Sequence, residues 1–433
     1  MGMTDLVAYV RSAPSRLARR TSGVYRREID GLRFFAIFIV LIGHLCERSQ
    51  RFATTAVGPG DVISQTFYYF FQRPGVGVEL FFMISGFVIF SPLAGKPRQA
   101  ITGGFVGNYF KRRLLRIEPP YILLLVVTYL VVVGTGYVPP ESHRFYEAPK
   151  SITTSLFASL AYSHGWLFGT APRLLPPGWS LEIEIQFYTL APLIFFLYLS
   201  VGNRRVRAWL GAVVLALSLA LAGAVQTGAS APHWEFTLLN FFPLFWAGIM
   251  FCDFEADLRA IAHRAPKALA GAVGWLGLLI LIAVPSVAPT SLAPKALQVA
   301  AMTSGCFLMF LGILRAESNW FYRFCASGWP SLVGSACYSL YLVHLQTMQV
   351  CDSLLARVLP AAIVDSPLAY FAVSVVIVLP LSIAGGLVFY SFVERTFMLK
   401  DWPSRFADVA RRFLASVGQL RSVNRVAVDD EPV

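Results

Sequence analysis

The chain has 433 residues, of which 56% are hydrophobic and only 14% are charged, and its formal net charge is +12. Soluble domains usually carry about a quarter charged residues, so this composition excludes an ordinary soluble enzyme and predicts a chain solvated largely by lipid. The positive charge is therefore interpreted as a signal of membrane topology, and we expect no nucleic-acid partner.

Ten stretches of the chain are long and apolar enough to cross about 30 Å of hydrocarbon as helices. An even number of spans puts both termini on the same side of the membrane. The sequence therefore predicts an all-α, polytopic membrane protein with about ten transmembrane helices, at residues 29–47, 75–94, 114–134, 180–200, 208–226, 236–252, 268–286, 296–314, 331–351 and 368–392.

Basic residues are distributed unequally between the two sides of the membrane. If the N-terminus lies inside, the segments on that side hold 27 of the 36 lysine and arginine residues, and the opposite segments hold 8. Because lysine and arginine collect in cytoplasmic loops, both termini are predicted to be cytoplasmic. We expect a multi-pass protein of the cell inner (plasma) membrane, with a basic cytoplasmic arm at 1–27, a transmembrane domain at 28–399 and a cytoplasmic tail at 400–433.

Two segments outside the spans are predicted to be ordered. The tail places Phe406, Phe413 and Leu420 at helical spacing, which indicates an amphipathic helix lying on the inner leaflet. The external connection at 135–178 contains a half-length apolar stretch at 151–168. Ordered loops of this size tend to be functional.

The first span carries the heaviest load of ionisable residues. Eleven positions separate Arg33 from His44, which places both on one helix face about 16 Å apart. Glu47 follows His44 by three positions, so its carboxylate can accept a hydrogen bond from the imidazole and fix the tautomer. We interpret His44 as a general base oriented by Glu47; the equal alternative is an imidazole satisfied by a neighbouring helix. For Arg33 the alternative is snorkelling or an ion pair with Asp30.

The second span places a carboxylate and a hydroxyl in an apolar helix. Glu79 is expected to pair with a cation or a hydroxyl across the bundle, because an unpaired charge is costly in lipid. Ser85 and Gly86 favour close packing of helices over nucleophilic chemistry, since no nucleophile-elbow pattern surrounds Ser85.

The third span begins with a cluster of basic residues at 111–116. Arg113 and Arg116 lie one turn apart on the same face, a spacing suited to gripping the phosphates of a cytoplasmic cofactor. Ordinary anchoring by positive residues at the inner face is the more general explanation of such clusters. Both interpretations stay open.

Two later spans carry polar side chains at helical spacing. In the fourth, Ser180, Glu184 and Tyr188 form one stripe that favours an external-side pocket over an interfacial belt of aromatic residues. In the ninth, His344 follows Tyr341 by three positions and supplies a second buried imidazole.

The remaining histidines and the cysteines give no metal or disulfide signal. The six cysteines occur singly, without a C-x-x-C motif, and no histidine and carboxylate pair has metal-ligand spacing, so no metal is expected. Four histidines in or near loops are expected to be solvated: His143, His164, His233 and His263.

Taken together, these segments resemble the acyltransferase-3 family of membrane acyltransferases over about residues 26–396. Five patches follow one another in the family's order, at 27–44, 77–87, 110–121, 179–188 and 338–344. The family's Arg/Lys-x10-His pattern falls on Arg33 and His44. Its Arg-x-x-Arg pattern falls on Arg113 and Arg116.

The resemblance implies transfer of an acyl group, usually acetyl from acetyl-CoA, to a hydroxyl of a carbohydrate acceptor such as a surface or secreted polysaccharide. The family's usual Asp is Glu79 here, a change that keeps the charge. Many relatives carry a fused external hydrolase-like domain, whereas only 34 residues follow Leu399. We therefore expect the membrane domain, or a separate partner, to complete the transfer.

The mechanism that we expect has Arg113 and Arg116 hold the phosphates of CoA while His44 removes the proton of the attacking hydroxyl. Arg33 would position the CoA arm or stabilise the developing oxyanion. Direct transfer and a covalent relay through a protein side chain both fit the sequence. We assign structural or acceptor-side roles to Glu79, Ser85, Trp179, Ser180, Glu184, Tyr188, Tyr341 and His344.

Two other functions from a different class compete with this interpretation. A transporter of a sugar-containing solute would use the same polar residues as a binding site or proton relay, although no internal repeat is visible. A flippase of a lipid-linked sugar would use the basic inner mouth and the long external connection. Neither of these functions requires turnover of an acyl-CoA.

Overall fold

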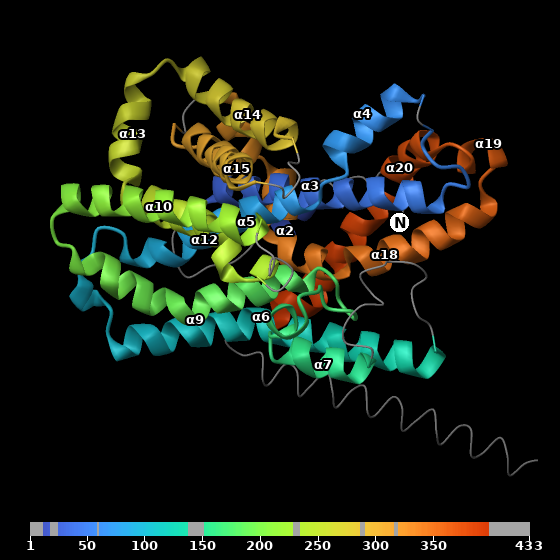
Figure 1. Ribbon diagram of the computed structural model, residues 1–433, viewed down its shortest axis with the longest axis horizontal. Helices are drawn as coiled ribbons and strands as arrows, with labels where there is room; N and C mark the ends of the chain where they lie inside the picture. Colours follow the sequence, from blue (N-terminus) through green and yellow to red (C-terminus); the bar gives the residue numbers. More distant parts are fainter. Residues whose placement is uncertain are drawn as a thin grey trace, which may run out of the picture.

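The protein is described by a computed structural model, and every regular element in the described residues is a helix (Figure 1). This confirms the all-α prediction for that part of the chain. The predicted amphipathic helix of the tail lies outside the described residues, which are 12–17, 25–58, 60–136, 151–227, 234–285, 291–315 and 319–397.

Seven helical segments of the described chain are long and apolar enough to cross a membrane, or eight if the bent pair α12 (Leu238–Asp253) and α13 (Glu255–Arg264) forms one span. The seven segments are α3 (Arg27–Phe52), α4 (Val62–Phe71) with α5 (Gly75–Phe90) and η1 (Ser91–Leu93), α6 (Gly103–Thr135), α9 (Gly178–Ser200), α10 (Arg204–Thr227), α15 (Leu292–Gly312), and α20 (Pro367–Phe389) with its extension to Phe397.

Two further predicted spans coincide with helices that fall short of this test. Helix α14 (Lys267–Ala283) is apolar but has 17 residues. Helix α18 (Cys337–Val358) has 22 residues but carries polar side chains, among them His344 and Asp352. All ten predicted spans therefore correspond to helices, while the number of crossings stays a prediction.

The other described elements are short. They are α2 (Ala13–Leu17), η2 (Arg98–Ala100), α7 (Ile152–Leu160), α8 (His164–Phe168), α16 (Trp320–Cys325), α17 (Gly328–Ser335), α19 (Ala361–Val364), the π-helical turn η4 (Tyr390–Glu394) and α21 (Arg395–Phe397). The half-length apolar stretch of the predicted external connection forms α7 and α8.

Helix α3 occupies the centre of the bundle. It contacts α5, α16, α17, α18 and α20, and it is the most buried of the spanning segments. Helices α3, α6, α9 and α10 all run along the long axis of the molecule in Figure 1. Four charged residues of α3 are therefore buried among other helices: Glu28, Asp30, Arg33 and Arg48.

Helices α5 and α12 approach each other through small residues. A Cβ atom at Gly86 of α5 would collide with the carbonyl oxygen of Phe245, and one at Gly248 of α12 would collide with that of Met83. Backbones this close leave no room for a side chain, as at other membrane helix interfaces. The structure thus confirms the interpretation of Gly86 as a packing residue.

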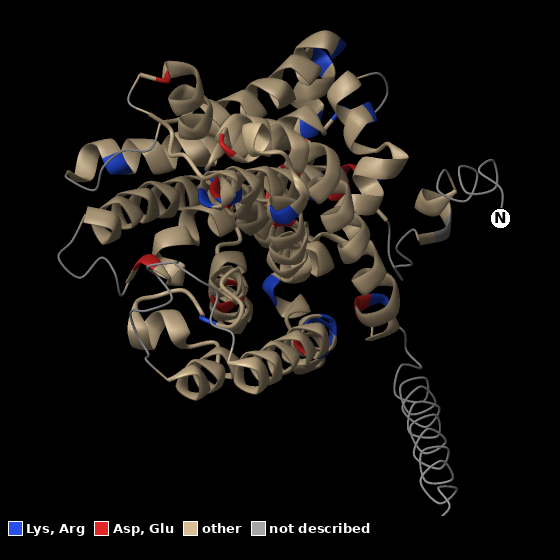
Figure 2. Cartoon of the chain, turned by 90° about the vertical axis from the view of Figure 1, so that its right-hand side faces the viewer, with Lys and Arg blue, Asp and Glu red and all other residues tan. Residues whose placement is uncertain are grey.

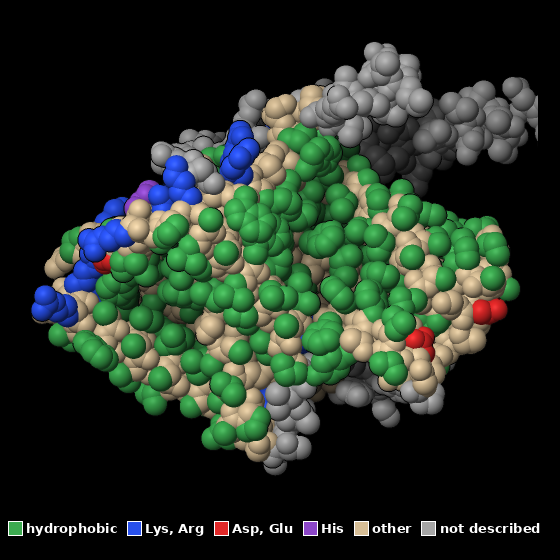
Figure 3. Space-filling model, turned by 90° about the horizontal axis from the view of Figure 1, so that it is seen from above, with side chains coloured by type: hydrophobic (Ala, Val, Ile, Leu, Met, Phe, Trp, Pro, Cys, Tyr) green, Lys and Arg blue, Asp and Glu red, His purple; other side chains and the backbone are tan. Residues whose placement is uncertain are grey.

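The outer surface of the bundle is largely apolar (Figure 3). Exposed leucine and valine side chains cover α6, α10 and α20, for example Leu130, Leu217 and Val376. Such a surface would be a large hydrophobic patch on a soluble protein, whereas lipid solvates it well. Basic side chains collect at the left edge of the same view, where an acidic one also lies, and the other visible acidic side chains lie toward the right.

Charged residues also lie inside the helical bundle (Figure 2). Arg48 of α3 and Asp352 of α18 form an ion pair, and both side chains are buried. Arg48 also donates to the Gln349 side chain at 2.8 Å, and the Tyr370 hydroxyl donates to the Asp352 backbone carbonyl at 3.2 Å. The contacts of Arg48 fix α3 against α18 one turn beyond His44, and Tyr370 joins α20 to the same place.

His164 corrects one expectation from the sequence. Its imidazole is buried rather than solvated, because α7 and α8 fold back on each other and both ring nitrogens find partners. Nδ1 lies 3.0 Å from the Thr170 carbonyl and Nε2 lies 3.1 Å from the Ser155 hydroxyl. His263 on α13 is exposed as expected, whereas His143 and His233 fall outside the described residues.

Candidate active site

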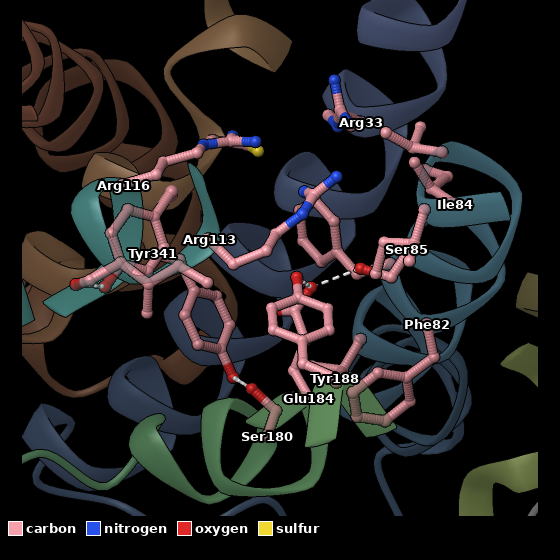
Figure 4. Close-up of a pocket in the computed structure, with 17 residues that line it drawn as sticks. Arg33, Phe82, Ile84, Ser85, Arg113, Arg116, Ser180, Glu184, Tyr188 and Tyr341 are labelled. Atoms are coloured by element: carbon pink, nitrogen blue, oxygen red, sulfur yellow. Dashed lines mark hydrogen bonds between the residues drawn. The ribbon is translucent and has the colours of Figure 1, made fainter. Parts of the chain in front are cut away.

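A cavity with about 750 Å³ of empty space lies where α5, α6, α9 and α18 meet, beside Arg33 of α3 (Figure 4). Part of this space is continuous with the surroundings of the protein. One wall is apolar and comes mainly from α5, with Val78, Phe81, Phe82, Ile84, Val88 and Ile89. The polar lining consists of Arg33, Ser85, Arg113, Arg116, Ser180, Glu184, Tyr188, Cys337, Tyr338 and Tyr341.

Three guanidinium groups meet at one end of the cavity. In Figure 4 the side chains of Arg33, Arg113 and Arg116 extend toward the same region from two different helices. Arg33 also forms an ion pair with the buried carboxylate of Asp30, one of the alternatives predicted for it. Arg33 therefore lines the cavity and is anchored from behind.

Helix α6 brings its two arginines to the cavity just before a proline pair. Pro119 and Pro120 lack the N–H groups that would bond to the carbonyls four residues earlier, so the helix is weakened at this turn. The Tyr338 hydroxyl donates to the Ile117 carbonyl at 2.6 Å and joins α18 to α6 there. Arg113 lies over the Tyr188 ring, 5.7 Å from its centroid.

Hydroxyl groups and one carboxylate line the rest of the cavity. Ser180, Glu184 and Tyr188 all face it, so the stripe predicted on α9 points into one pocket. The hydroxyls of Ser85 and Tyr188 both donate to Glu184 Oε1, which joins α5 to α9. Ser180 and Tyr341 share a hydrogen bond of 2.7 Å between their hydroxyl oxygens.

The two intramembrane imidazoles of α3 and α18 lie against each other. The ring centroids of His44 and His344 are 5.1 Å apart. His44 Nδ1 lies 2.8 Å from Glu47 Oε2, as the spacing predicts. His344 is fully buried, and its Nδ1 lies 2.9 Å from the Tyr341 carbonyl oxygen and 3.2 Å from that of Leu340.

Within the described residues, the hydrogen bonds of both imidazoles engage Nδ1 rather than Nε2. Carbonyl oxygens only accept, so Nδ1 of His344 carries the proton and Nε2 holds a lone pair. In the described part of the chain this buried Nε2 has no hydrogen-bond partner. If Nδ1 of His44 donates to Glu47, its Nε2 is likewise free to accept a proton.

The imidazole pair lies next to the cavity but does not line it. Tyr341 connects the two, because its hydroxyl faces the cavity and its ring lies 5.9 Å from the His344 ring. On the other side His44 is half-buried, and the Glu47 side chain is 43% exposed. The pair thus stands between the arginine-lined cavity and an open surface.

Comparison with known proteins decides the family. Residues 26–387 match the model of the acyltransferase-3 family, Acyl_transf_3, described as an acyltransferase domain. The chain belongs to this family. Together with its seven apolar helical segments, membership makes the chain a multi-pass membrane acyltransferase.

Three relatives illustrate how far the similarity extends. Nodulation protein 10 of Rhizobium leguminosarum bv. viciae is 26% identical over 59% of this chain and 65% of its own length. Acyltransferase MdmB of Streptomyces mycarofaciens is 22% identical over 89% of this chain and 93% of its own. O-acetyltransferase OatA of Staphylococcus aureus is 28% identical over 41% of this chain and 26% of its own. No solved structure matches this acyltransferase.

Besides His44, Glu47 and His344, two residues singled out from the sequence of this acyltransferase lie away from the cavity lining. Glu79 is half-buried on α5 and interacts electrostatically with Arg73 and Lys295, but no ion pair or hydrogen bond of its carboxylate is recorded among the described residues. The Trp179 ring packs against the Phe241 ring, with centroids 5.5 Å apart. Its ring also meets that of Phe82, a wall residue, with centroids 6.3 Å apart, so Trp179 supports the wall from outside the cavity lining.

Sequence reasoning missed Glu394 of the acyltransferase. Its side chain is 1% exposed and lies 3.6 Å from Arg116, measured from Oε1 to Nε. The predicted last span ended at residue 392, two positions before this carboxylate, so Glu394 was not singled out. A carboxylate within one turn of an apolar span was the signal that could have found it.

Proposed function

We propose that this acyltransferase transfers an acyl group, most simply acetyl from acetyl-CoA, to a hydroxyl of a carbohydrate acceptor such as a surface or secreted polysaccharide. The observation that carries the proposal is the arrangement of two chemically different sites on either side of Tyr341. An arginine-lined cavity lies on one side, and the pair of His44 and His344 lies on the other.

The cavity suits an anionic donor. Its lining presents three guanidinium groups and one carboxylate, Glu184, which already accepts two hydroxyl hydrogen bonds. One guanidinium group can donate two parallel hydrogen bonds to the oxygens of a phosphate. We therefore assign Arg113 and Arg116 to the phosphates of CoA. The apolar wall from α5 offers a surface for the less polar pantetheine arm and acyl group.

The imidazole pair suits general base catalysis. His44 Nε2 would take the proton of the acceptor hydroxyl as its oxygen attacks the thioester carbonyl. When the carbon–sulfur bond breaks, the same proton would pass to the CoA thiolate. Glu47 would hold the tautomer and stabilise the transient imidazolium, and Arg33 would stabilise the developing oxyanion or position the CoA arm.

The two substrates would approach from opposite sides. The basic edge in Figure 3 includes the end of the molecule where α13 lies, which supports the cytoplasmic assignment of that edge. Acetyl-CoA would then enter from the cytoplasm, and the acceptor would reach His44 from the side where Glu47 is exposed. This orientation fits a protein of the cell inner (plasma) membrane.

The direct test measures acyl transfer by the purified chain in lipid nanodiscs. Radiolabelled acetyl-CoA is incubated with extracts of surface glycans, and label in the glycan and free CoA are both followed. Wild type and His263→Ala, which changes an exposed histidine on α13, should transfer label, and His44→Ala should not. Movement of a sugar-containing solute across vesicles without release of CoA would instead support a transporter or flippase.

The same assay separates direct transfer from a covalent relay. We expect no label on the protein when the acceptor is left out, because direct transfer has no acyl-protein intermediate. Label that survives denaturation and maps to Ser85, Tyr188 or His344 would overturn direct transfer and establish a relay.

A further inference from the structure

The last spanning helix ends in a π-helical turn. Helix α20 runs to Phe389, and η4 follows without a break and ends at Glu394. A π-helical turn holds one more residue than an α-helical turn of the same rise, and such turns occur frequently at functional sites. Here the turn ends on a carboxylate that is almost completely buried.

The Glu394 carboxylate accepts one short hydrogen bond and lies near one cation. The Ser339 hydroxyl donates to Glu394 Oε2 at 2.7 Å. The other oxygen, Oε1, has no hydrogen-bond partner among the described residues, but it lies 3.6 Å from Arg116 Nε. A buried carboxylate without a nearby cation would be strongly unfavourable, so Arg116 is the residue that makes this burial possible.

Arg116 is held from behind the cavity wall. Arg116 lines the cavity, whereas Glu394 and Ser339 do not. The carboxylate faces the Nε edge of the guanidinium group, and no hydrogen bond from the terminal nitrogens to another described residue is recorded. The two terminal nitrogens are therefore available on the cavity side. Figure 4 shows the Arg116 side chain extended toward Arg113 and Arg33.

Arg113 provides the contrast. No ion pair of Arg113 with a carboxylate is recorded in the described part of the chain, and its guanidinium group lies over the Tyr188 ring. Among the described residues, the cavity thus combines Arg116, which a buried carboxylate fixes, with Arg113, which lies against a ring. A guanidinium group that is already fixed loses less conformational entropy when a ligand binds, so binding is more favourable.

We propose that Glu394 is a positioning residue that fixes the Nε edge of Arg116, so that the terminal nitrogens present a preformed fork to a phosphate group of the donor. This proposal rests on the proposed function, because it takes a CoA thioester as the donor. Glu394 itself does not touch the donor. Its effect is transmitted entirely through Arg116.

The test compares Glu394→Gln with wild type in nanodiscs and measures KM for acetyl-CoA and kcat separately. Loss of the preformed fork should raise KM for acetyl-CoA about tenfold, the equivalent of one charge-assisted hydrogen bond, with kcat changed less than about twofold. In an Arg116→Ala background, Glu394→Gln should raise KM no further. Glu394→Asp should restore part of the lost affinity.

A second variant keeps the proposal testable if Glu394→Gln does not fold. Ser339→Ala retains the carboxylate and its charge but frees one of its oxygens, so it should raise KM for acetyl-CoA by a smaller factor. If Glu394→Gln folds and its KM for acetyl-CoA is unchanged, the proposal is overturned. If only Ser339→Ala folds, an unchanged KM for acetyl-CoA in that variant overturns it. A further rise of KM in the Arg116→Ala background would do the same, because the effect would then bypass Arg116.

The outcome for wild type separates this proposal from the proposed function. Binding of acetyl-CoA to wild type is measured first by isothermal titration calorimetry. If wild type binds no acetyl-CoA, the proposed donor is wrong and the proposed role of Glu394 is wrong as well. If wild type binds acetyl-CoA and the variants bind it equally well, only the role of Glu394 is wrong.

Discussion

The imidazole rings of His44 and His344 lie with their centroids 5.1 Å apart, each with Nδ1 held by an acceptor. Nδ1 of His344 carries its ring proton, because both of its partners are carbonyl oxygens, so its Nε2 presents a lone pair. The pair links α3 to α18 at the point where the proposed chemistry takes place.

Replacement of His344 tests whether the second imidazole takes part. We expect His344→Ala to lower kcat by about 10²-fold, the range found for loss of acid–base assistance, and to leave binding of acetyl-CoA unchanged. His344→Gln should lose as much, although it fills more of the space. Activity near the wild-type level in His344→Gln would show that the residue only packs against His44.

Adjacent arginines on α6 offer a matched pair for donor binding. Arg113 lines the cavity, whereas Arg112 is exposed. Arg113→Ala should weaken binding of acetyl-CoA at least tenfold, because a charge-assisted contact to phosphate is lost. Arg112→Ala should bind acetyl-CoA like wild type. Equal losses in both variants, measured by calorimetry, would indicate a general effect of surface charge.

Two glycines test the close contact between α5 and α12. Gly86→Ala places a methyl group against the Phe245 backbone, so we expect a loss of stability of about 1–3 kcal/mol. Gly107→Ala on α6 meets no atom within 4 Å, so it should leave stability unchanged or raise it by up to about 1 kcal/mol. Thermal unfolding in detergent provides the comparison, and a stable Gly86→Ala would contradict the observed packing.

The folded α7–α8 segment predicts a dependence of stability on pH. Burial lowers the pKa of His164 below its ordinary value, so the folded protein resists protonation more than the unfolded chain does. This residue therefore contributes stability above the ordinary histidine pKa of about 6.5, and that contribution is lost as pH falls toward the lower folded pKa.

His164→Gln should accordingly show a smaller decrease in Tm between pH 7.5 and pH 5.5 than wild type. His263→Gln, which alters an exposed histidine, should keep the wild-type decrease. Identical pH profiles for all three proteins would mean that His164 titrates alike in the folded and unfolded states.

The sequence by itself determined the features that depend on the period of a single helix. Apolar length predicted every long helix, and the spacing of 3.6 residues per turn placed Glu184 beside Tyr188 and His44 beside Glu47. These pairs are local, because residues three or four apart on a helix are neighbours whatever surrounds them.

Only the tertiary structure decided which helix faces meet. No local rule brings Ser85 to Glu184, His44 to His344 or Arg116 to Glu394, because each pair joins different helices. The same holds for His164, which two short helices enclose although the sequence predicted a solvated histidine. Contacts between helices depend on how small residues such as Gly86 let backbones approach, and that information is distributed over the whole bundle.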